Sequence, residues 1–249
     1  MSKAFAVIFA AAGQSSRFKM RTKKPFTSLA GRPVWLRAAE PFVNRENVIQ
    51  SIICISPSDM EMFKTTYGAN LMFMNIQLVE GGKERHDSIA HALAVLKPEV
   101  EFVAIHDAVR PCITTKIIDE VFAAAVNHGA AIPALPVTET LKKVDAQGQI
   151  TGTTDRAGLW QAQTPQVFRR DWLEEAYHNR DKIQQQVTDD AQLLELFGKC
   201  VVTVHGSAAN IKITYPEDLV LAENILKSNE KSLAASRPRS GPFDEDWMK

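Results

Sequence analysis

The sequence predicts an α/β domain built on a mostly parallel sheet that helices cover on both faces. Three observations support this prediction. Short apolar, β-branched runs alternate with segments of helical periodicity along most of the chain. These runs are apolar at consecutive positions, which is typical of strands buried on both faces. The chain has 249 residues, enough to bury a large core without disulfide bonds.

Each expected strand is one of these apolar runs, and each expected helix is a periodic segment between two of them. In chain order the elements are strand 5–12, helix 34–44, strand 49–55, strand 76–79, helix 85–96, strand 102–106, helix 115–128, strand 130–136, helix 170–179, helix 189–196, strand 200–205 and helix 216–227. Because strands and helices alternate, neighbouring strands should run parallel.

Two stretches interrupt this alternation. Between residues 137 and 163 the turn signal DAQGQ separates KKV from ITGTT, which predicts a β-hairpin that projects from the body. Beyond residue 228 the sequence becomes rich in Ser, Pro and charged residues, which is typical of a disordered tail. We therefore expect a single domain over residues 1–228, with an arm at 137–163 and a disordered tail over 229–249.

Composition limits the partners and the compartment. Lys and Arg number 29 and Asp and Glu also number 29, so the net charge is zero, and we expect neither a nucleic-acid polymer as partner nor a membrane association. The longest apolar run, near the N-terminus, is far shorter than a membrane span. The cysteines Cys54, Cys112 and Cys200 are widely spaced, which favours a reducing cytoplasm over a disulfide framework or a zinc site.

The zero net charge hides a basic N-terminal segment. No acidic residue precedes Glu40, whereas this segment contains Lys3, Arg17, Lys19, Arg21, Lys23, Lys24, Arg32 and Arg37. The loop after the first strand begins AAGQSSRF and lacks both the dinucleotide-binding glycine pattern and the P-loop pattern. Its small residues allow backbone N–H groups to approach phosphates, with Arg17 and Lys24 as charge partners. A solvated basic loop is the alternative, with about equal weight.

Two further segments follow predicted strands. GGKERHDS opens a helix, and its glycines permit a ligand to approach the backbone closely, although a plain tight turn explains it as well. In HDAVRP, Asp107 ends an apolar strand, where a carboxylate can hold Mg²⁺ against substrate phosphates. A turn or helix-capping role for Asp107 is the alternative. No hydrolytic triad or HExxH pattern is present.

Taken together, these segments resemble the cytidylyltransferase family that acts on 2-C-methyl-D-erythritol 4-phosphate in the non-mevalonate isoprenoid pathway. The resemblance covers about residues 5 to 226 and depends on seven motifs in series. In chain order these are AAGQSSRF, GGKERHDS, HDAVRP, PVTETLKKV, TTDRAGLWQAQTPQVF, TDDAQLLE and NIKITYPEDLVLAE.

The resemblance implies a three-layer, Rossmann-like nucleotidyltransferase fold and a homodimer in which each hairpin arm embraces the other subunit. It implies CTP and a sugar-alcohol phosphate as substrates, with Mg²⁺ or another divalent cation held at Asp107. The implied catalytic residues are Arg17, Lys24 and Lys212. The implied nucleotide-binding residues are Ala11, Ala12, Gly13, Gly82, Lys83, Ser88 and Asp107. The implied residues for the sugar phosphate are Thr140, Arg156 and Thr164.

The sequence departs from the family pattern at two points of the first loop. Ser15 stands where many relatives carry a second glycine. Lys23-Lys24-Pro25 differs from the commoner Pro-Lys-Gln, so Lys24 is aligned with the catalytic lysine and Lys23 is the alternative.

Other functions stay open at this stage. A ribitol 5-phosphate cytidylyltransferase would share the fold and the chemistry. A non-catalytic nucleotide sensor, a glycosyltransferase and an NAD(P)-dependent dehydrogenase are less consistent with the sequence. The last lacks its glycine pattern, and Asp189-Asp190 is not the Asp-x-Asp motif of a glycosyltransferase.

Overall fold

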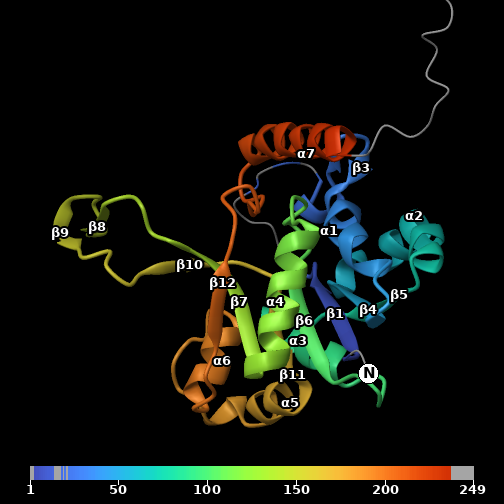
Figure 1. Ribbon diagram of the computed structural model, residues 1–249, viewed down its shortest axis with the longest axis horizontal. Helices are drawn as coiled ribbons and strands as arrows, with labels where there is room; N and C mark the ends of the chain where they lie inside the picture. The colour runs from blue at the N-terminus through green and yellow to red at the C-terminus, as the bar shows by residue number, and fades with distance from the viewer. Residues whose placement is uncertain (1–2, 14–17, 19, 21, 237–249) are drawn as a thin grey trace, which may run out of the picture.

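The computed structural model describes residues 3–13, 18, 20 and 22–236. Its centre is an eight-stranded sheet with the strand order β10-β7-β11-β6-β1-β4-β5, in which β12 also pairs with β7 (Figure 1). The strands are β1 (Phe5–Ala10), β4 (Val48–Ile55), β5 (Ile76–Glu80), β6 (Phe102–Asp107), β7 (Ala130–Pro136), β10 (Trp160–Ala162), β11 (Gln166–Arg169) and β12 (Val202–His205).

The prediction of a mostly parallel sheet is confirmed. β1 pairs in parallel with β4 and β6, β4 with β5, and β12 with β7. The exceptions are β11, which lies antiparallel between β6 and β7, and β10, which runs antiparallel to β7. Neither strand was predicted, because three or four residues are too few to show a periodicity.

Helices cover both faces of the sheet, as predicted. The helices are α1 (Val34–Val43), α2 (Met60–Phe73), α3 (Arg85–Leu93), α4 (Thr115–His128), α5 (Arg170–His178), α6 (Asp190–Leu196) and α7 (Glu217–Ser236). Phe5, Val7 and Phe9 of β1 pack in one core with α1, α2 and α4. Ala6 and Ile8, which alternate with them, pack in a second core with α3, α5 and α6. The result is the expected three-layer arrangement.

Two helices differ from the prediction. α2 was not predicted, because Phe63 is its only buried residue and its apolar side chains do not gather on one face. α7 was expected to end at residue 227 but continues to Ser236, so the predicted tail begins inside a helix. Residues 237–249, which form the rest of the predicted tail, lie outside the described residues.

A third apolar cluster joins α7 to the edge of the sheet where the strands end. Phe18 and Leu29 pack there against Val109, Ile213 and Ala222. Leu29 belongs to the small β2–β3 hairpin (Ser28–Leu29 and Arg32–Pro33). This packing holds the basic N-terminal segment beside the end of β6 and the segment before α7.

The predicted hairpin is present and projects from the body (Figure 1). Its strands β8 (Leu141–Val144) and β9 (Ile150–Thr154) pair antiparallel. β10 pairs with the body strand β7, so the last part of the predicted arm belongs to the main sheet. Val144 and Ile150 are exposed in the arm, which has no core of its own. No helix in the described part of the chain combines the length and the apolar character needed to cross a membrane.

Candidate active site

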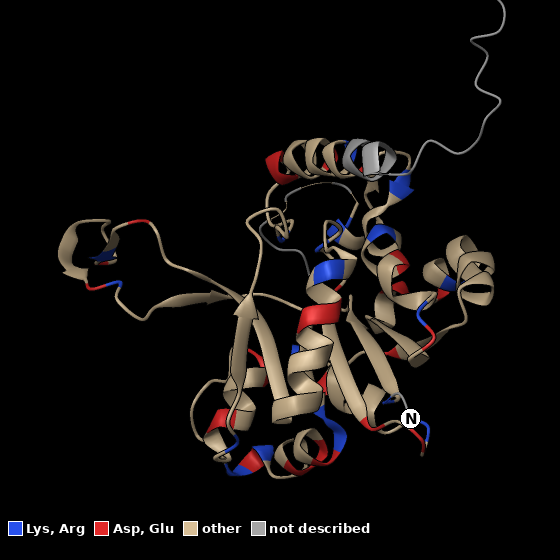
Figure 2. Ribbon diagram, viewed as in Figure 1, with Lys and Arg blue, Asp and Glu red and all other residues tan. Residues whose placement is uncertain are grey.

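A cavity of about 450 Å³ lies where β1 and β6 end. Most residues that the sequence singled out line this cavity, although they come from five separate stretches of the chain. They are Ala11, Ala12, Gly13, Lys24, Gly82, Lys83, Ser88, Asp107 and Lys212. Arg17, the other predicted catalytic residue, lies outside the described residues. Basic and acidic residues are interspersed over the molecule, so the charges at the cavity are not part of a larger patch of one sign (Figure 2).

The turn between β5 and α3 touches the loop after β1 at Gly81. A Cβ atom on Gly81 would lie 2.6 Å from Cβ of Ala12 and 2.9 Å from Oγ of Ser88. The Gly81 N–H donates to the carbonyl of Ile55 at 2.8 Å, which fixes the turn against β4. Only glycine permits this contact, so Gly81 is explained by the packing of the turn against the loop after β1.

Ser88 organises that turn from inside. Its hydroxyl donates to the carbonyl of Glu84 at 3.2 Å and accepts from the Gly82 N–H at 3.0 Å. The predicted nucleotide-binding roles of Gly82 and Ser88 therefore concern groups that already hydrogen-bond each other.

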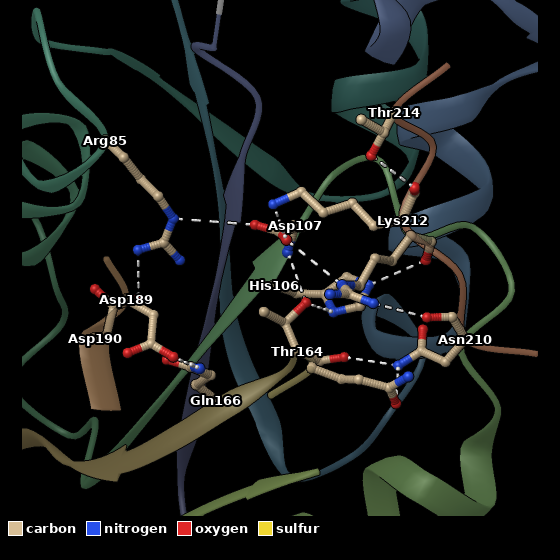
Figure 3. A network of polar contacts seen from close by, with 12 residues as sticks. Arg85, His106, Asp107, Thr164, Gln166, Asp189, Asp190, Asn210, Lys212 and Thr214 are labelled. Carbon is tan, nitrogen blue, oxygen red and sulfur yellow. Dashed lines mark hydrogen bonds and ion pairs between the residues drawn. The ribbon is translucent and has the colours of Figure 1, made fainter. Parts of the chain in front are cut away.

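Asp107 is the electrostatic centre of the site, at the carboxyl end of β6, as predicted. Its Oδ2 lies 2.9 Å from Nζ of Lys212 and 3.5 Å from Nε of Arg110. Its Oδ1 lies 4.0 Å from Nε of Arg85. Figure 3 shows Lys212 and Arg85 reaching the carboxylate from different directions. Burial by itself would raise the pKa of Asp107, but the three cations outweigh it and hold the pKa well below its usual value.

Thr164 supports Asp107 from behind. Its hydroxyl oxygen accepts the backbone N–H of Asp107 at 3.0 Å and lies 3.0 Å from Nδ1 of His106 (Figure 3). The other ring nitrogen of His106, Nε2, lies 3.2 Å from the carbonyl of Arg110. Thr164 was predicted to bind the sugar phosphate, but it is buried and absent from the cavity wall. Its hydroxyl serves to fix the end of β6.

This buried histidine should make stability depend on pH. Burial lowers the pKa of His106 from its ordinary 6.5 to about 4. The unfolded chain takes up a proton below about pH 6.5 and the folded chain only below about pH 4. The free energy of unfolding should therefore fall by about 3 kcal/mol as the pH drops through this window. Denaturant unfolding at pH 7 and pH 4.5 measures the loss.

In the same experiment His106→Gln should show a smaller fall, while His128→Gln, which changes an exposed histidine, should keep it. An equal pH dependence in His106→Gln and the unaltered chain would contradict the assignment to His106.

Asn210 ties the segment that bears Lys212 to the same network. The carbonyl of Asn210 accepts Nη1 of Arg110 at 2.8 Å, and its Nδ2 donates to the carbonyl of Thr164 at 3.0 Å. Asn210 is fully buried. These bonds fix the backbone two residues before Lys212, which brings the ammonium group to Asp107 although 105 positions separate the two residues in the sequence.

The sequence analysis assigned no role to Arg85, which lines the cavity as the first residue of α3. Its Nη1 donates to Oδ2 of Asp190 at 2.6 Å, and Tyr177 donates its hydroxyl to Oδ1 of Asp190 at 2.5 Å. The position of Arg85 inside GGKERHDS was the available signal. Asp190 lies in the TDDAQLLE motif and Tyr177 lies in no motif, but nothing in the sequence shows that α5 and α6 pack beside α3.

A second cavity, of about 560 Å³, lies on the other side of Arg85, lined also by Tyr177 and Asp190. None of the predicted catalytic or binding residues lines it within the described part of the chain. We therefore place the active site in the cavity around Asp107.

The two adjacent lysines of the first loop have different surroundings. Nζ of Lys23 lies 2.6 Å from Oδ2 of Asp59, which also accepts the hydroxyl of Ser56 at 2.6 Å. Lys24 instead lines the cavity, at the start of the short helix η1 (Lys24–Phe26). The geometry therefore favours Lys24 over Lys23 as the lysine that meets a ligand.

Thr140 and Arg156 lie in the arm and are absent from the cavity wall of their own chain. Both are exposed. Arg156 donates to the carbonyl of Thr138, which links the two limbs of the arm. The structure therefore does not unite the arm residues with the Asp107 cavity of the same chain.

A divalent cation fits this site only with ligands from a substrate. No group of three or more His, Cys, Asp and Glu side chains suited to a metal occurs among the described residues. Asp107 is one ionised carboxylate at the cavity wall, and Mg²⁺ at such sites is held by one or two carboxylates together with substrate phosphates and water. The chemistry of the donor set thus agrees with a cation that arrives with a nucleotide.

A family model described as 2-C-methyl-D-erythritol 4-phosphate cytidylyltransferase matches residues 5–228 of this chain. The enzyme of that name from Pelotomaculum thermopropionicum is 39% identical over 239 residues, covering 94% of this chain and 98% of its own length. The bifunctional enzyme IspD/IspF from Desulfotalea psychrophila is 38% identical over 96% of this chain, which spans 61% of that longer protein.

Solved structures show the same likeness. The crystal structure of 4-diphosphocytidyl-2C-methyl-D-erythritol synthase from Anaerococcus prevotii superposes with a TM-score of 0.77 at 29% identity, covering 91% of this chain and 97% of its own. The structure of 2-C-methyl-D-erythritol 4-phosphate cytidylyltransferase from Thermus thermophilus gives a TM-score of 0.74 at 29% identity, with 91% and 100% covered.

Proposed function

This chain belongs to the 2-C-methyl-D-erythritol 4-phosphate cytidylyltransferase family, and from that membership we propose what its cavity does. The chain transfers a cytidylyl group from CTP to 2-C-methyl-D-erythritol 4-phosphate, in non-mevalonate isoprenoid biosynthesis. The products are 4-diphosphocytidyl-2-C-methyl-D-erythritol and pyrophosphate. The observation that supports this proposal is the ion pair of Asp107 and Lys212 at the wall of a cavity where parallel strands end.

The reaction needs no general base, since the attacking phosphate oxygen is already anionic at neutral pH. This oxygen forms a bond to the α-phosphorus of CTP while the bond to the bridging oxygen breaks and pyrophosphate leaves. The barrier arises from repulsion between two anions and from charge that builds up on the phosphoryl group. Positioned cations are therefore what the reaction requires.

The cavity supplies such cations from two sides. Lys24 comes from the N-terminal segment and Lys212 from the segment before α7. We propose that they contact the triphosphate, with Arg17 as a third cation. When bound, Mg²⁺ would neutralise phosphate charge, and Asp107 is the residue that would hold it. The small residues Ala11, Ala12 and Gly13 leave room for the nucleotide to approach the backbone of the loop.

We propose that the protein works as a homodimer with exchanged arms. The arm is an isolated two-stranded hairpin with exposed apolar residues, and such hairpins are marginally stable alone. Its predicted substrate residues do not line the cavity of their own chain. A partner's cavity is the place where they would act. Sedimentation at assay concentrations tests this, and a fully active monomer would contradict it.

Removal of the arm cation should affect the acceptor substrate selectively. Arg156→Ala should raise KM for 2-C-methyl-D-erythritol 4-phosphate at least tenfold with little change in KM for CTP, because Arg156 would bind the phosphate's non-reacting oxygens. Steady-state kinetics with each substrate varied in turn measures both values. Lys142→Ala, which changes an arm residue bonded to Thr153, is the matched control. A rise confined to the KM for CTP would contradict the assignment.

Pyrophosphate release is the direct test of function. The purified chain is incubated with CTP and Mg²⁺, together with 2-C-methyl-D-erythritol 4-phosphate, with ribitol 5-phosphate or with no acceptor. Release only with the methylerythritol phosphate is expected. If pyrophosphate were released only with ribitol 5-phosphate, that compound would be the acceptor substrate. If no pyrophosphate were released in any of the three mixtures, the transferase assignment would be rejected.

We also propose that the chain works in the cytoplasm. All three cysteines are free, and Cys200 is exposed, which suits a reducing compartment. Cell fractionation with an antibody to the chain tests the location.

A further inference from the structure

We propose that Asp190 is a positioning residue, which holds the guanidinium of Arg85 at the wall of the CTP cavity and keeps it from closing on Asp107. The proposal uses the cavity of the proposed function but assigns a role to residues outside its predicted set. It rests on a series of contacts from Tyr177 to Asp190, from Asp190 to Arg85 and from Arg85 to Asp107, which joins three helices and the end of β6 (Figure 3 labels all but Tyr177).

Arg85 lies between two carboxylates at unequal distances. Its Nη1 is 2.6 Å from Oδ2 of Asp190, whereas its Nε is 4.0 Å from Oδ1 of Asp107. The contact with Asp190 is therefore a charge-assisted hydrogen bond and the contact with Asp107 is only electrostatic. Arg85 lines the cavity, and its side chain is one third exposed.

Asp190 is itself rigidly held. Its side chain is 2% exposed, and its two oxygens each have a separate partner, Tyr177 on one and Arg85 on the other. Gln166 fixes the start of α6, because its Oε1 accepts the backbone N–H of Ala191 at 3.1 Å and its Nε2 donates to Asp189 at 2.7 Å. A carboxylate so buried is costly unless its partners are fixed, so this geometry orients Arg85 strongly.

Without the charge on Asp190, the nearest anion for Arg85 would be Asp107. A shift of Arg85 onto Asp107 would withdraw a cation from the cavity and would add a tight partner to the carboxylate proposed to hold Mg²⁺. Asp190 thus keeps two site residues apart. This consequence separates a positioning role from a simple contribution to the stability of α6.

The test measures CTP binding as well as turnover. Isothermal titration with CTP and Mg²⁺, without acceptor, compares the unaltered chain with Asp190→Asn, Arg85→Gln and the double variant. We expect Asp190→Asn to weaken CTP binding about tenfold, the size of one lost hydrogen bond to a charged group. The double variant should bind CTP as Arg85→Gln alone does, because Asp190 acts through Arg85.

Arg180→Gln is the matched control. It breaks a 2.7 Å ion pair between Arg180 and Asp87. Asp87 lies on α3, as Arg85 does, but the pair does not include Arg85. It should leave CTP binding within about twofold, and thermal unfolding checks that the variants fold. If Asp190→Asn does not fold, Tyr177→Phe decides, since it removes one bond to Asp190 and should weaken CTP binding about threefold.

Unchanged CTP binding in folded Asp190→Asn, or in Tyr177→Phe where that variant decides, would overturn the proposal, as would additive losses in the double variant. Failure of the proposed function is a separate result, because it would appear as absent pyrophosphate release in the unaltered chain. CTP titrations of that chain and its variants would still report on Asp190.

Discussion

Lys24→Ala should lower kcat by at least ~10²-fold, the loss that follows removal of one preorganised group that stabilises developing charge. Lys24 lines the cavity at the start of η1, in a different segment of the chain from Lys212. Its ammonium group would meet charge that grows as pyrophosphate leaves, so the loss should fall mainly on kcat. Steady-state pyrophosphate release, with both substrates saturating, measures it.

Lys23→Ala is the natural control, because it removes the neighbouring charge without touching the cavity. Lys23 is paired with Asp59, and a partly exposed pair of this kind contributes about 1 kcal/mol or less to stability. We expect kcat within about threefold of the unaltered chain. Near-normal turnover in Lys24→Ala together with a large loss in Lys23→Ala would shift the alignment of the loop by one residue.

Asp107→Asn should lower kcat/KM by about 10²- to 10³-fold while the chain still folds. The substitution keeps the shape of the side chain but removes the charge that faces Lys212, Arg110 and Arg85. It also removes the only anionic group proposed to hold Mg²⁺. The measurement is kcat/KM at increasing Mg²⁺, where added cation should restore little of the rate.

Asp119→Asn provides the comparison for Asp107→Asn. Asp119 is an exposed aspartate on α4 that pairs with Arg45, away from the cavity, and its loss should leave kcat/KM unchanged. If Asp107→Asn retained kcat/KM within about threefold, the site would have to be placed elsewhere. Thermal unfolding of both variants separates a catalytic loss from a loss of folded protein.

The sequence predicted the framework of the fold because long apolar strands and amphipathic helices repeat along the chain. The predicted bounds of helix 115–128 match α4, and its capping residue Thr114 and terminal Gly129 explain why such ends can be read. α2 and β11 were not predicted, for two different reasons. α2 buries a single residue, and β11 is short and owes its place to its neighbours in the sheet.

The candidate site divides in the same way. Ala11, Gly82 and Asp107 could be singled out because each lies in a segment whose residue types fit a phosphate ligand, whereas Lys212 was implied only by the family resemblance. The network behind them could not. Asn210 lies in a motif, but its bond to Arg110 exists only because segments 100 positions apart pack together. Tyr177 lies in no motif, and its bond to Asp190 depends on how α5 packs against α6.

The sequence by itself determined which residue types meet at the edge of the sheet, since the end of a parallel strand fixes where its next residues lie. The tertiary structure alone decided their states. It placed three cations around Asp107, buried His106 in neutral form and turned Arg85 toward Asp190. The reason is physical. Local patterns set backbone conformation over a few residues, whereas charge, burial and hydrogen-bond partners depend on contacts across 100 or more positions.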